Sequence, residues 1–502
     1  MCLSLIVVGL DVLIITMALP SAQKDLDASG SQLQWSVDAY TLAFGGLILI
    51  GGGLADRLGR KRVFLAGLVV LLAFSVAAAF APSAGALIAF RAGMGVGSAL
   101  IMPATLSLIK HVFPPHEQAK AMGLWVGAAS LGLPLGPVLG GVLLSHFWWG
   151  SVFLVNVPVV GAALFLGWAL IPGARQERHS PLDLVGVLLS LAGMVSLVYG
   201  VIEGPQHGWT SPLTVGLLVA GAGLLAVFIW WERHTPHPML NRAVFEDRRF
   251  GGPVVTIGAG AFAMFGGLFV MTQYLQFTMG YTPLEAGLRL LFCCTIVLSA
   301  PIAPMLVERL GLKPVAITGL LCVALALVLL PGASTGSDTL ALASLALVGF
   351  GLGFVLPPST NSIMEATPAH QAGAGSAVAD VAMQVGGALG VAVMGSVLTT
   401  AYRDGLPDLA ALPAAAGEAA RGSIGGALAA ADQLGGAAGA DLALAAREAF
   451  VAALGEAALV GVAVCLVGGL LAAFALPRRR QQAAPVSVAP VDEPRTADPV
   501  PR

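Results

Sequence analysis

Four charged residues interrupt long apolar stretches of the chain: Asp11, Asp38, Arg91 and Asp380. An ionisable side chain in hydrocarbon costs at least about 2.5–3.5 kcal/mol, so each of them needs a physical reason to be there. Burial disfavours the charged form of a carboxyl group, so an acid in an apolar cavity can release its proton when a cation arrives. The three acids are therefore candidate sites for exchanging a proton for a cation. The alternative at each is a structural carboxylate that neighbouring helices satisfy.

Arg91 keeps its charge permanently, so inside a helical bundle it must meet a carboxylate, backbone carbonyls or water. In the string RAGMGVG, Arg91 and Gly95 lie on one helix face, which lets a neighbouring helix approach the guanidinium closely. The arginine either modulates proton transfer or anchors the bundle. Tyr40 follows Asp38 by two positions and could present an aromatic face to a cation, although packing is the simpler interpretation.

Two glycine-containing strings indicate closely packed and moving helices. The first, GLADRLGRK, places an acid and several bases between glycines, which suits a charged gating latch as well as a simple positive loop. The second has the pattern GxxxGPxxGG, whose glycines make a flat helix face and whose proline bends the helix. The candidate residues of these strings are Gly53, Asp56, Arg57, Gly59, Arg60, Gly132, Gly136, Pro137, Gly140 and Gly141.

No pattern for enzymatic chemistry accompanies these residues. HEQAK at 116–120 lacks the second histidine of a zinc-binding helix. Neither GxSxG nor GxxxxGKS is present, which also excludes an ATP-driven pump. The five cysteines include no CxxC pair. We therefore expect no catalytic residue, no metal site, no cofactor and no nucleic-acid partner.

The elements that must position the four charged residues are membrane-spanning helices. Of the 502 residues 57% are hydrophobic and only 10% are charged, with a mean hydropathy of +0.88, which is too apolar for a soluble fold. Apolar windows of about 19 residues recur along the chain, and each is long enough to cross a bilayer. The expected class is an all-α membrane protein with spans near 3–22, 37–54, 63–81, 84–109, 120–144, 151–171, 182–202, 213–231, 251–275, 286–306, 314–331, 340–364, 373–402 and 451–476, fourteen in all.

Internal repeats indicate how the spans are organised. LADRLGRK at 54–61 returns as LVERLGLK at 306–313, and GVGSALIMP at 95–103 returns as GFGLGFVLP at 349–357. Repeats in one order at nearly one spacing indicate two six-helix bundles with a helix pair inserted between them. The expected units are an N-terminal bundle (1–172), the inserted seventh and eighth helices (173–249), a C-terminal bundle (250–480) and a disordered cytoplasmic tail (481–502).

The distribution of charge orients the chain. Most of the 25 basic residues fall on one side of the membrane when both termini are cytoplasmic. A long Ala- and Gly-rich segment at 403–450 then lies outside. It should contain short helices near 418–434 and 441–454, and it is either a tolerant linker or a lid.

Several strings together resemble the signatures of the fourteen-helix drug:proton antiporters of the major facilitator superfamily. They are LDVLIITMALP (10–20), QWSVDAY (34–40), GLADRLGRK (53–61), RAGMGVGSALIMP (91–103), LGLPLGPVLGG (131–141) and FLVNVP (153–158). The resemblance implies a major facilitator fold and a monomer that exports lipophilic cationic drugs, dyes, antiseptics or antibiotics across a bacterial inner membrane in exchange for protons. It also implies that Asp11 and Asp38 bind protons or cations, that Arg91 assists proton movement and that Asp56 belongs to a gating latch.

Departures from the family pattern narrow this expectation. Met94 stands where these proteins usually carry glutamine, and FCCTIVLSAPIAP (292–304) has no carboxylate where some exporters of dications carry one. We therefore expect monovalent cations to be handled better than divalent ones. Two other functions stay open, a narrow exporter of one antibiotic or metabolite and a non-transporting membrane sensor or scaffold.

Overall fold

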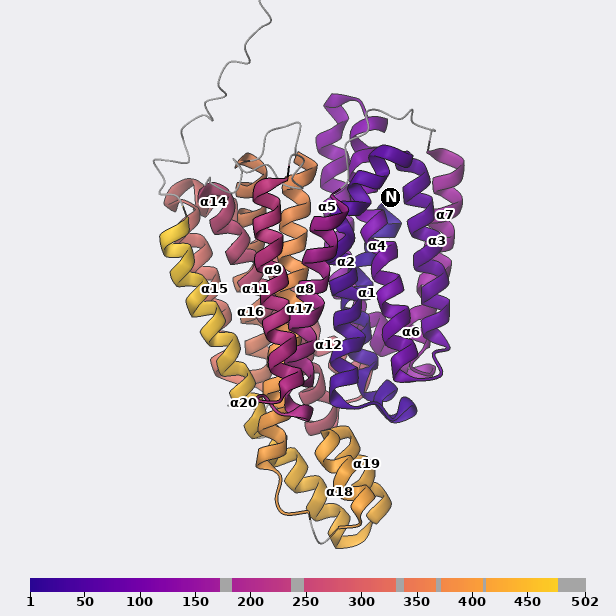
Figure 1. The fold of residues 1–502 in the computed structure, drawn as a ribbon, viewed down its shortest axis with the longest axis vertical. Helices are drawn as coiled ribbons and strands as arrows, with labels where there is room; N and C mark the ends of the chain where they lie inside the picture. Colours follow the sequence, from indigo (N-terminus) through magenta and orange to yellow (C-terminus); the bar gives the residue numbers. More distant parts are fainter. Residues whose placement is uncertain (172–182, 236–247, 331–337, 367–371, 410–411, 477–502) are drawn as a thin grey trace, which may run out of the picture.

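The computed structural model describes residues 1–171, 183–235, 248–330, 338–366, 372–409 and 412–476. Figure 1 shows that most of the helices run roughly along the long axis of the molecule. No strand occurs in the described ranges. The expected all-helical class is confirmed.

The first bundle is built from the N-terminal helices. Ser29 begins α2 with a capping box, in which its hydroxyl accepts from the Gln32 amide and the Gln32 side chain accepts from the Ser29 amide. α2 packs along α4, α3 packs along α4, and α1 packs along α5. The helices are α1 (Cys2–Leu26), α2 (Gly30–Leu58), α3 (Arg60–Ala79), α4 (Ala84–Val112), α5 (Pro115–His146), α6 (Ser151–Leu154) and α7 (Asn156–Leu170).

The second bundle contains the helices after the inserted pair. α11 packs along α17, and α15 packs against both α16 and α20. The helices are α11 (Arg248–Gln273), which continues as a π-helical turn (Tyr274–Thr278), α12 (Pro283–Leu290), a 3₁₀ turn (Leu291–Thr295), α13 (Ile296–Ser299), α14 (Ile302–Leu310), α15 (Leu312–Leu329), α16 (Asp338–Ala366), α17 (Ala372–Gly405), α18 (Ala414–Gly422), α19 (Ile424–Leu434) and α20 (Gly436–Ala475).

The repeated string of the sequence makes the same turn in both bundles. Gly59 separates α2 from α3 with φ of 97°, and Gly311 separates α14 from α15 with φ of 89°. Glycine enters this region of backbone space at little cost because it has no Cβ. The two copies of the string therefore share a backbone geometry as well as a pattern of charge.

Ten helices in the described ranges are long and apolar enough to cross a membrane, and twelve if each of two bent helix pairs is one span. Two further expected spans, 37–54 and 120–144, fall inside α2 and α5 but are not among the twelve. The fourteen-helix count therefore stays a prediction.

Two elements differ from their expected form. The span expected at 286–306 is broken, since Pro283–Ser299 and Ile302–Leu310 meet at an angle of 46° around Pro301. A proline removes one backbone hydrogen bond and favours such a bend. The last span, expected at 451–476, is the end of a single helix of 40 residues, so the short helix expected near 441–454 is part of α20.

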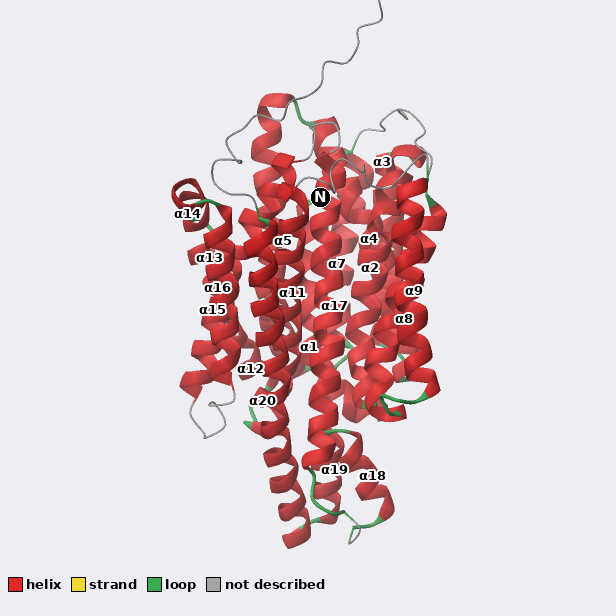
Figure 2. Cartoon of the chain, turned by 60° about the vertical axis from the view of Figure 1, so that its left-hand side comes forward, coloured by secondary structure: helices red, strands yellow, loops and turns green. Residues whose placement is uncertain are grey.

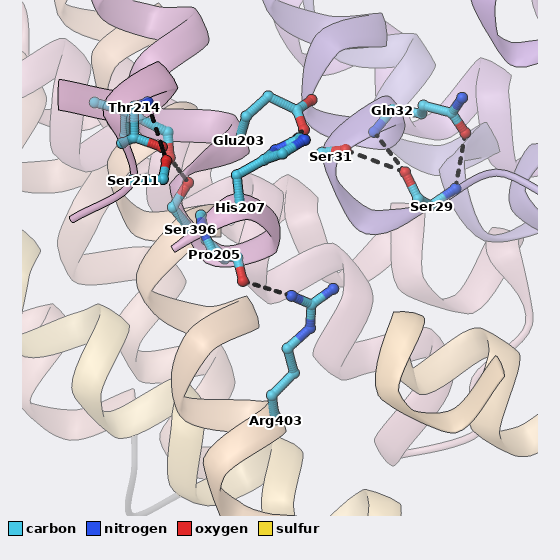
Figure 3. Close-up of polar contacts among 11 residues, drawn as sticks. Ser29, Ser31, Gln32, Glu203, Pro205, His207, Ser211, Thr214, Ser396 and Arg403 are labelled. Carbon is cyan, nitrogen blue, oxygen red and sulfur yellow. Dashed lines mark hydrogen bonds and ion pairs between the residues drawn. The ribbon is translucent and has the colours of Figure 1, made fainter. Parts of the chain in front are cut away.

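The inserted pair consists of α8 (Leu184–His207) and α9 (Pro212–His234). α8 packs against α2 of one bundle and α17 of the other, and α9 packs on α8. Ser396 donates to the Val201 carbonyl at 2.7 Å, and Arg403 donates to the Pro205 carbonyl at 2.6 Å (Figure 3). On the side of α2, the Trp35 and Tyr199 rings lie 5.5 Å apart. Hydrogen bonds and apolar contacts thus hold α8 across the line where α2 meets α17.

A two-helix cap, defined as Ala414–Leu434 (α18 and α19), projects from one end of the bundles (Figure 2). It contacts both bundles. Gln23 of α1 donates to the Ser423 hydroxyl at 2.5 Å, and Tyr402 of α17 donates to the Ala420 carbonyl at 3.0 Å. We call this end of the molecule the cap end.

Candidate functional site

Arg91 occupies a buried polar cluster in the first bundle. Its Nε donates to the Ser36 carbonyl at 2.9 Å, and its Nη1 donates to the backbone carbonyl of Asp11 at 3.3 Å. The guanidinium carbon lies 4.4 Å from the centre of the Tyr40 ring. The permanent cation therefore lies between backbone carbonyls and an aromatic face, which are the uncharged partners that suit a buried guanidinium.

Asp11 belongs to the same cluster. Its side chain is fully buried, and Oδ1 accepts from Asn156 Nδ2 at 2.7 Å. The same amide nitrogen lies 3.0 Å from the Ser75 hydroxyl. The Asp11 carboxylate also interacts with the charge of Arg91. The Asp11 Oδ2 atom, however, is buried and has no hydrogen-bond partner among the described residues. The amide donor and the nearby cation therefore compensate this acid only in part, and the structure is compatible with an anchoring role as well as with a proton site.

Tyr40 completes this cluster. Its hydroxyl forms a 2.9 Å hydrogen bond with Ser98 and donates to the Val8 carbonyl at 3.4 Å. The side chain is fully buried, with its ring against Arg91. Helices α1, α2 and α4 thus bring Asp11, Arg91 and Tyr40 together. The cation that lies over the Tyr40 ring is the guanidinium of Arg91, from the protein itself.

Asp38 lies apart from this cluster, on the face of α2 that meets the second bundle. Gln34 and Gly45 lie on the same helix face, and they contact Gly395 and Gln384 of α17. The Asp38 side chain is fully buried, yet neither carboxylate oxygen has a hydrogen-bond partner among the described residues. A buried carboxylate without donors is strongly destabilised as an anion, so this acid favours its neutral form or a cationic ligand.

Two further polar side chains lie on the contact between α2 and α17. The Oε1 atom of Gln34 and the Nε2 atom of Gln384 are buried and have no hydrogen-bond partner among the described residues. Asp380 lies one turn before Gln384 on α17 and is partly exposed. The structure therefore places Asp38 and Asp380 on the facing helices of the two bundles. We call this contact, with Gln34, Asp38, Asp380 and Gln384, the α2–α17 seam.

Sequence analysis missed Asn156, Gln34 and Gln384 as site residues. Asn156 is the polar residue of FLVNVP, and Gln34 begins QWSVDAY. Both residues therefore stand in strings that resemble family signatures. Gln384 stands in an ordinary apolar stretch. Only its position opposite Gly45, where the two helices touch, distinguishes it.

The glycines of α5 contact one helix of each bundle, α1 and α12. A Cβ built on Gly132 would clash with the Ile6 carbonyl and stand 2.9 Å from Gly9 Cα of α1. A Cβ on Gly140 would stand 3.1 Å from Met17 Cβ, also on α1. On the other face, a Cβ on Gly141 would stand 2.7 Å from Leu284 Cα of α12. Gly136 and Pro137 are buried between these contacts.

Replacing Gly132 by alanine should lower the stability of the protein. The added methyl group meets backbone atoms of α1, which cannot move aside as a side chain can, so we expect a loss of about 1–3 kcal/mol in the free energy of unfolding. Gly161 of α7 is the matched control, because a Cβ there meets no atom within 4 Å. Gly161→Ala should be neutral or stabilising, and unfolding in detergent measures both. Equal losses in the two variants would contradict the expectation.

The charged latch expected at 53–61 lies partly outside the described residues, because the side chain of Asp56 is not among them. Gly53 is near the end of α2, and Gly59 makes the turn to α3. Arg57 and Arg60 both make polar or electrostatic interactions. Lys61 donates to the Trp168 and Ile171 carbonyls at 2.8 and 2.5 Å, so this base satisfies the end of α7 within its own bundle. The latch itself stays a prediction.

The sequence also matches known proteins. The family model described as Major Facilitator Superfamily matches residues 1–391. Multidrug resistance protein Stp of Mycobacterium tuberculosis is 37% identical over 79% of this chain and 74% of its own. The tetracenomycin C resistance and export protein of Streptomyces glaucescens is 34% identical over 80% and 75%, and the methyl viologen resistance protein SmvA of Salmonella typhimurium is 35% identical over 88% and 90%.

Solved structures share the arrangement of the helices. A bacterial homologue of the human lysosomal transporter Spinster superposes with a TM-score of 0.63 at 18% identity, over 94% of this chain and 95% of that one. The expected fold is thereby confirmed. The family model covers most of the chain, and the relatives and the two-bundle fold agree with it. The chain therefore belongs to the Major Facilitator Superfamily.

Proposed function

We propose that this protein exports lipophilic monovalent cations, including drugs, dyes and antiseptics, in exchange for protons. The observation that carries the proposal is Asp38, a fully buried carboxyl group where the two bundles meet, which has no hydrogen-bond partner in the described part of the chain. An arriving cation stabilises the ionised carboxylate and displaces its proton, and a returning proton displaces the cation. Relatives named for multidrug resistance support this class of cargo.

The membrane arrangement follows from the same proposal. The cap end faces outside, both termini lie in the cytoplasm, and the protein resides in a bacterial inner membrane as a monomer. The bundles at 1–172 and 250–480 rock about the α2–α17 seam, so that Asp38 meets one side of the membrane at a time. An exchange of one proton for one monovalent cation moves no net charge, so the pH gradient drives it without ATP. The membrane potential adds about 2.3 kcal/mol per 100 mV only for each additional proton that enters.

Everted vesicles test this function directly. An acidic lumen should drive uptake of a lipophilic monovalent dye, because the lumen corresponds to the outside of the cell. A protonophore that collapses the pH gradient should stop the uptake, and vesicles without the protein supply the background. Uptake that continues unchanged after the gradients have collapsed would refute proton coupling.

The same vesicles test the preference for monovalent cations. The described helices from Leu291 to Val307 contain no carboxylate that could balance a second positive charge. We therefore expect a mono-quaternary dye to be transported faster than a bis-quaternary one of similar size. One relative is named for resistance to methyl viologen, which is itself a dication, so equal rates and equal coupling are the result that would overturn this preference.

The second candidate function is the export of one antibiotic or one class of compound. The relative from Streptomyces glaucescens is named as an export protein for one antibiotic, tetracenomycin C. A resistance profile confined to one compound class would favour this candidate, whereas efflux of several unrelated cationic dyes would favour the broad one.

A further inference from the structure

Two hydrogen bonds join α1 of the first bundle to the second half of the chain at the cap end. Gln276, in the π-helical turn that continues α11, donates from Nε2 to the Met17 carbonyl of α1 at 3.3 Å. Nearer the end of α1, Gln23 donates from Nε2 to the Ser423 hydroxyl of the cap at 2.5 Å. We call this pair of hydrogen bonds the α1 tether.

The backbone around Gln276 is a π-helical turn. The Met279 amide donates to the Tyr274 carbonyl at 3.1 Å, and the Tyr281 amide donates to the Leu275 carbonyl at 3.0 Å. In an α-helix the amide of Thr278 would bond to the Tyr274 carbonyl instead. Such turns are rare and occur frequently at functional sites. Because the extra residue in the turn changes the direction of the side chains that follow, the reach of Gln276 to α1 depends on this geometry.

The α1 tether lies where three parts of the molecule meet. Tyr274 is 1% exposed and Phe277 is 9% exposed, so the π-helical turn is largely buried. A Cβ built on Gly425 of the cap would stand 2.5 Å from Gln23 Oε1 and 3.1 Å from Phe277 Cζ. Helix α1, the π-helical turn and the cap are therefore in close contact at this point.

Elsewhere α1 is attached mainly to its own bundle. It packs along α5, whereas its contacts with α11, α12 and α19 are far less extensive. An opening of the cap end would carry α1 away from the second bundle, and both hydrogen bonds of the α1 tether would have to break. Because the apolar contact across this boundary is small, the two hydrogen bonds make a large share of what holds it closed.

We propose that Gln276 is a positioning residue of the transport cycle, which holds α1 against the second bundle and so keeps the cap end closed. It acts through the Met17 carbonyl and does not touch the cargo. Gln23 is the second donor of the same tether. The inference rests on the alternating access of the proposed function, but it is independent of the cargo and of proton coupling.

Labelling of a cysteine at the cap end tests the role of Gln276. A Cβ built on Gly30 of α2 would stand 3.6 Å from Thr399 Oγ1 and 3.5 Å from the Gly422 carbonyl, so Thr399 of α17 lies where both bundles and the cap meet. Thr399→Cys places a thiol there. The full chain in lipid nanodiscs is treated with a charged maleimide, and chain without the substitution supplies the background from the native cysteines.

Gln276→Met keeps the length of the side chain and removes the amide donor. It should raise the labelling rate at position 399 by about tenfold, the largest effect expected for one hydrogen bond between neutral groups. Gln433→Met, on the exposed face of the cap, is the matched control and should leave the rate unchanged. The native Cys465, which is completely buried in α20, should not become more reactive in either variant.

Three results would overturn the proposal. The first is an unchanged labelling rate at position 399 in Gln276→Met. The second is a rate that rises in Gln23→Met and not in Gln276→Met, because the cap alone would then hold α1. The third is an equal rise at Cys465, which would show that the whole fold has loosened. Since both faces of a nanodisc are open to the reagent, a failure of proton-driven uptake in everted vesicles would refute the proposed function without changing these results.

Discussion

Replacing Asp38 by asparagine abolishes proton-driven cation uptake, with a fall of at least about a hundredfold, the scale on which a positioned proton-transfer group acts. Asparagine preserves the shape of the side chain, so the contact between α2 and α17 should survive. The amide neither releases a proton nor becomes a negative partner for a cation. Uptake of a monovalent dye into everted vesicles with an acidic lumen measures the effect.

Two comparisons make the Asp38 result specific. Asp25→Asn is the same substitution at an exposed position near the end of α1, and transport should stay at the wild-type level. Asp11→Asn should reduce transport less than Asp38→Asn does, because Asp11 already has an amide donor and a nearby arginine. Wild-type transport in Asp38→Asn, in protein that is folded and inserted, would remove Asp38 from the mechanism.

The contrast between the two acids could not be read from the sequence. Asp11 and Asp38 are both single acids in apolar stretches, and the same reasoning applied to each. Their surroundings differ because of contacts distant in the chain. Asn156 reaches Asp11 from α7, whereas no such donor reaches Asp38 among the described residues. The local sequence indicates that an acid is buried. Which donors or cations compensate its charge depends on contacts between helices that are distant in the chain.

The two-bundle architecture was more accessible to sequence analysis because its signals are local or repeated. Hydrophobic length predicts each span, and the turn at Gly59 recurs at Gly311 because both copies of the string need the same backbone conformation. The α2–α17 seam carried no such signal. Gln34 and Gln384 lie on different bundles, and nothing periodic in the sequence relates one to the other.

The departures at α12–α14 and α20 have simple physical causes. The span at 286–306 was expected to be continuous, and it bends at Pro301, because a proline in the sequence does not reveal how far the helix will bend. In α20 the polar residues near 441–448 suggested a separate outer helix. No proline lies between this segment and the final span, and the Ala-rich composition favours one uninterrupted helix. The polar residues therefore did not mark a helix end.

Arg91 is the residue whose loss should cost the most stability. Its guanidinium satisfies the Ser36 and Asp11 carbonyls, packs on Tyr40 and offsets the charge of Asp11. Arg91→Leu removes all of these contacts and leaves the Asp11 carboxylate without a nearby cation. Breaking a buried charge pair by removing one partner typically costs about 3–5 kcal/mol, and we expect a loss of this size in the free energy of unfolding in mixed micelles.

The double variant decides whether charge or shape accounts for that loss. Adding Asp11→Asn to Arg91→Leu removes the uncompensated carboxylate and keeps the amide contact with Asn156, so it should restore at least about 1 kcal/mol. Arg447→Leu, on an exposed part of α20, is the matched control and should change stability by no more than about 0.5 kcal/mol. If the double variant is no more stable than Arg91→Leu alone, the arginine acts through its hydrogen bonds and packing, and the charge of Asp11 is balanced by other means.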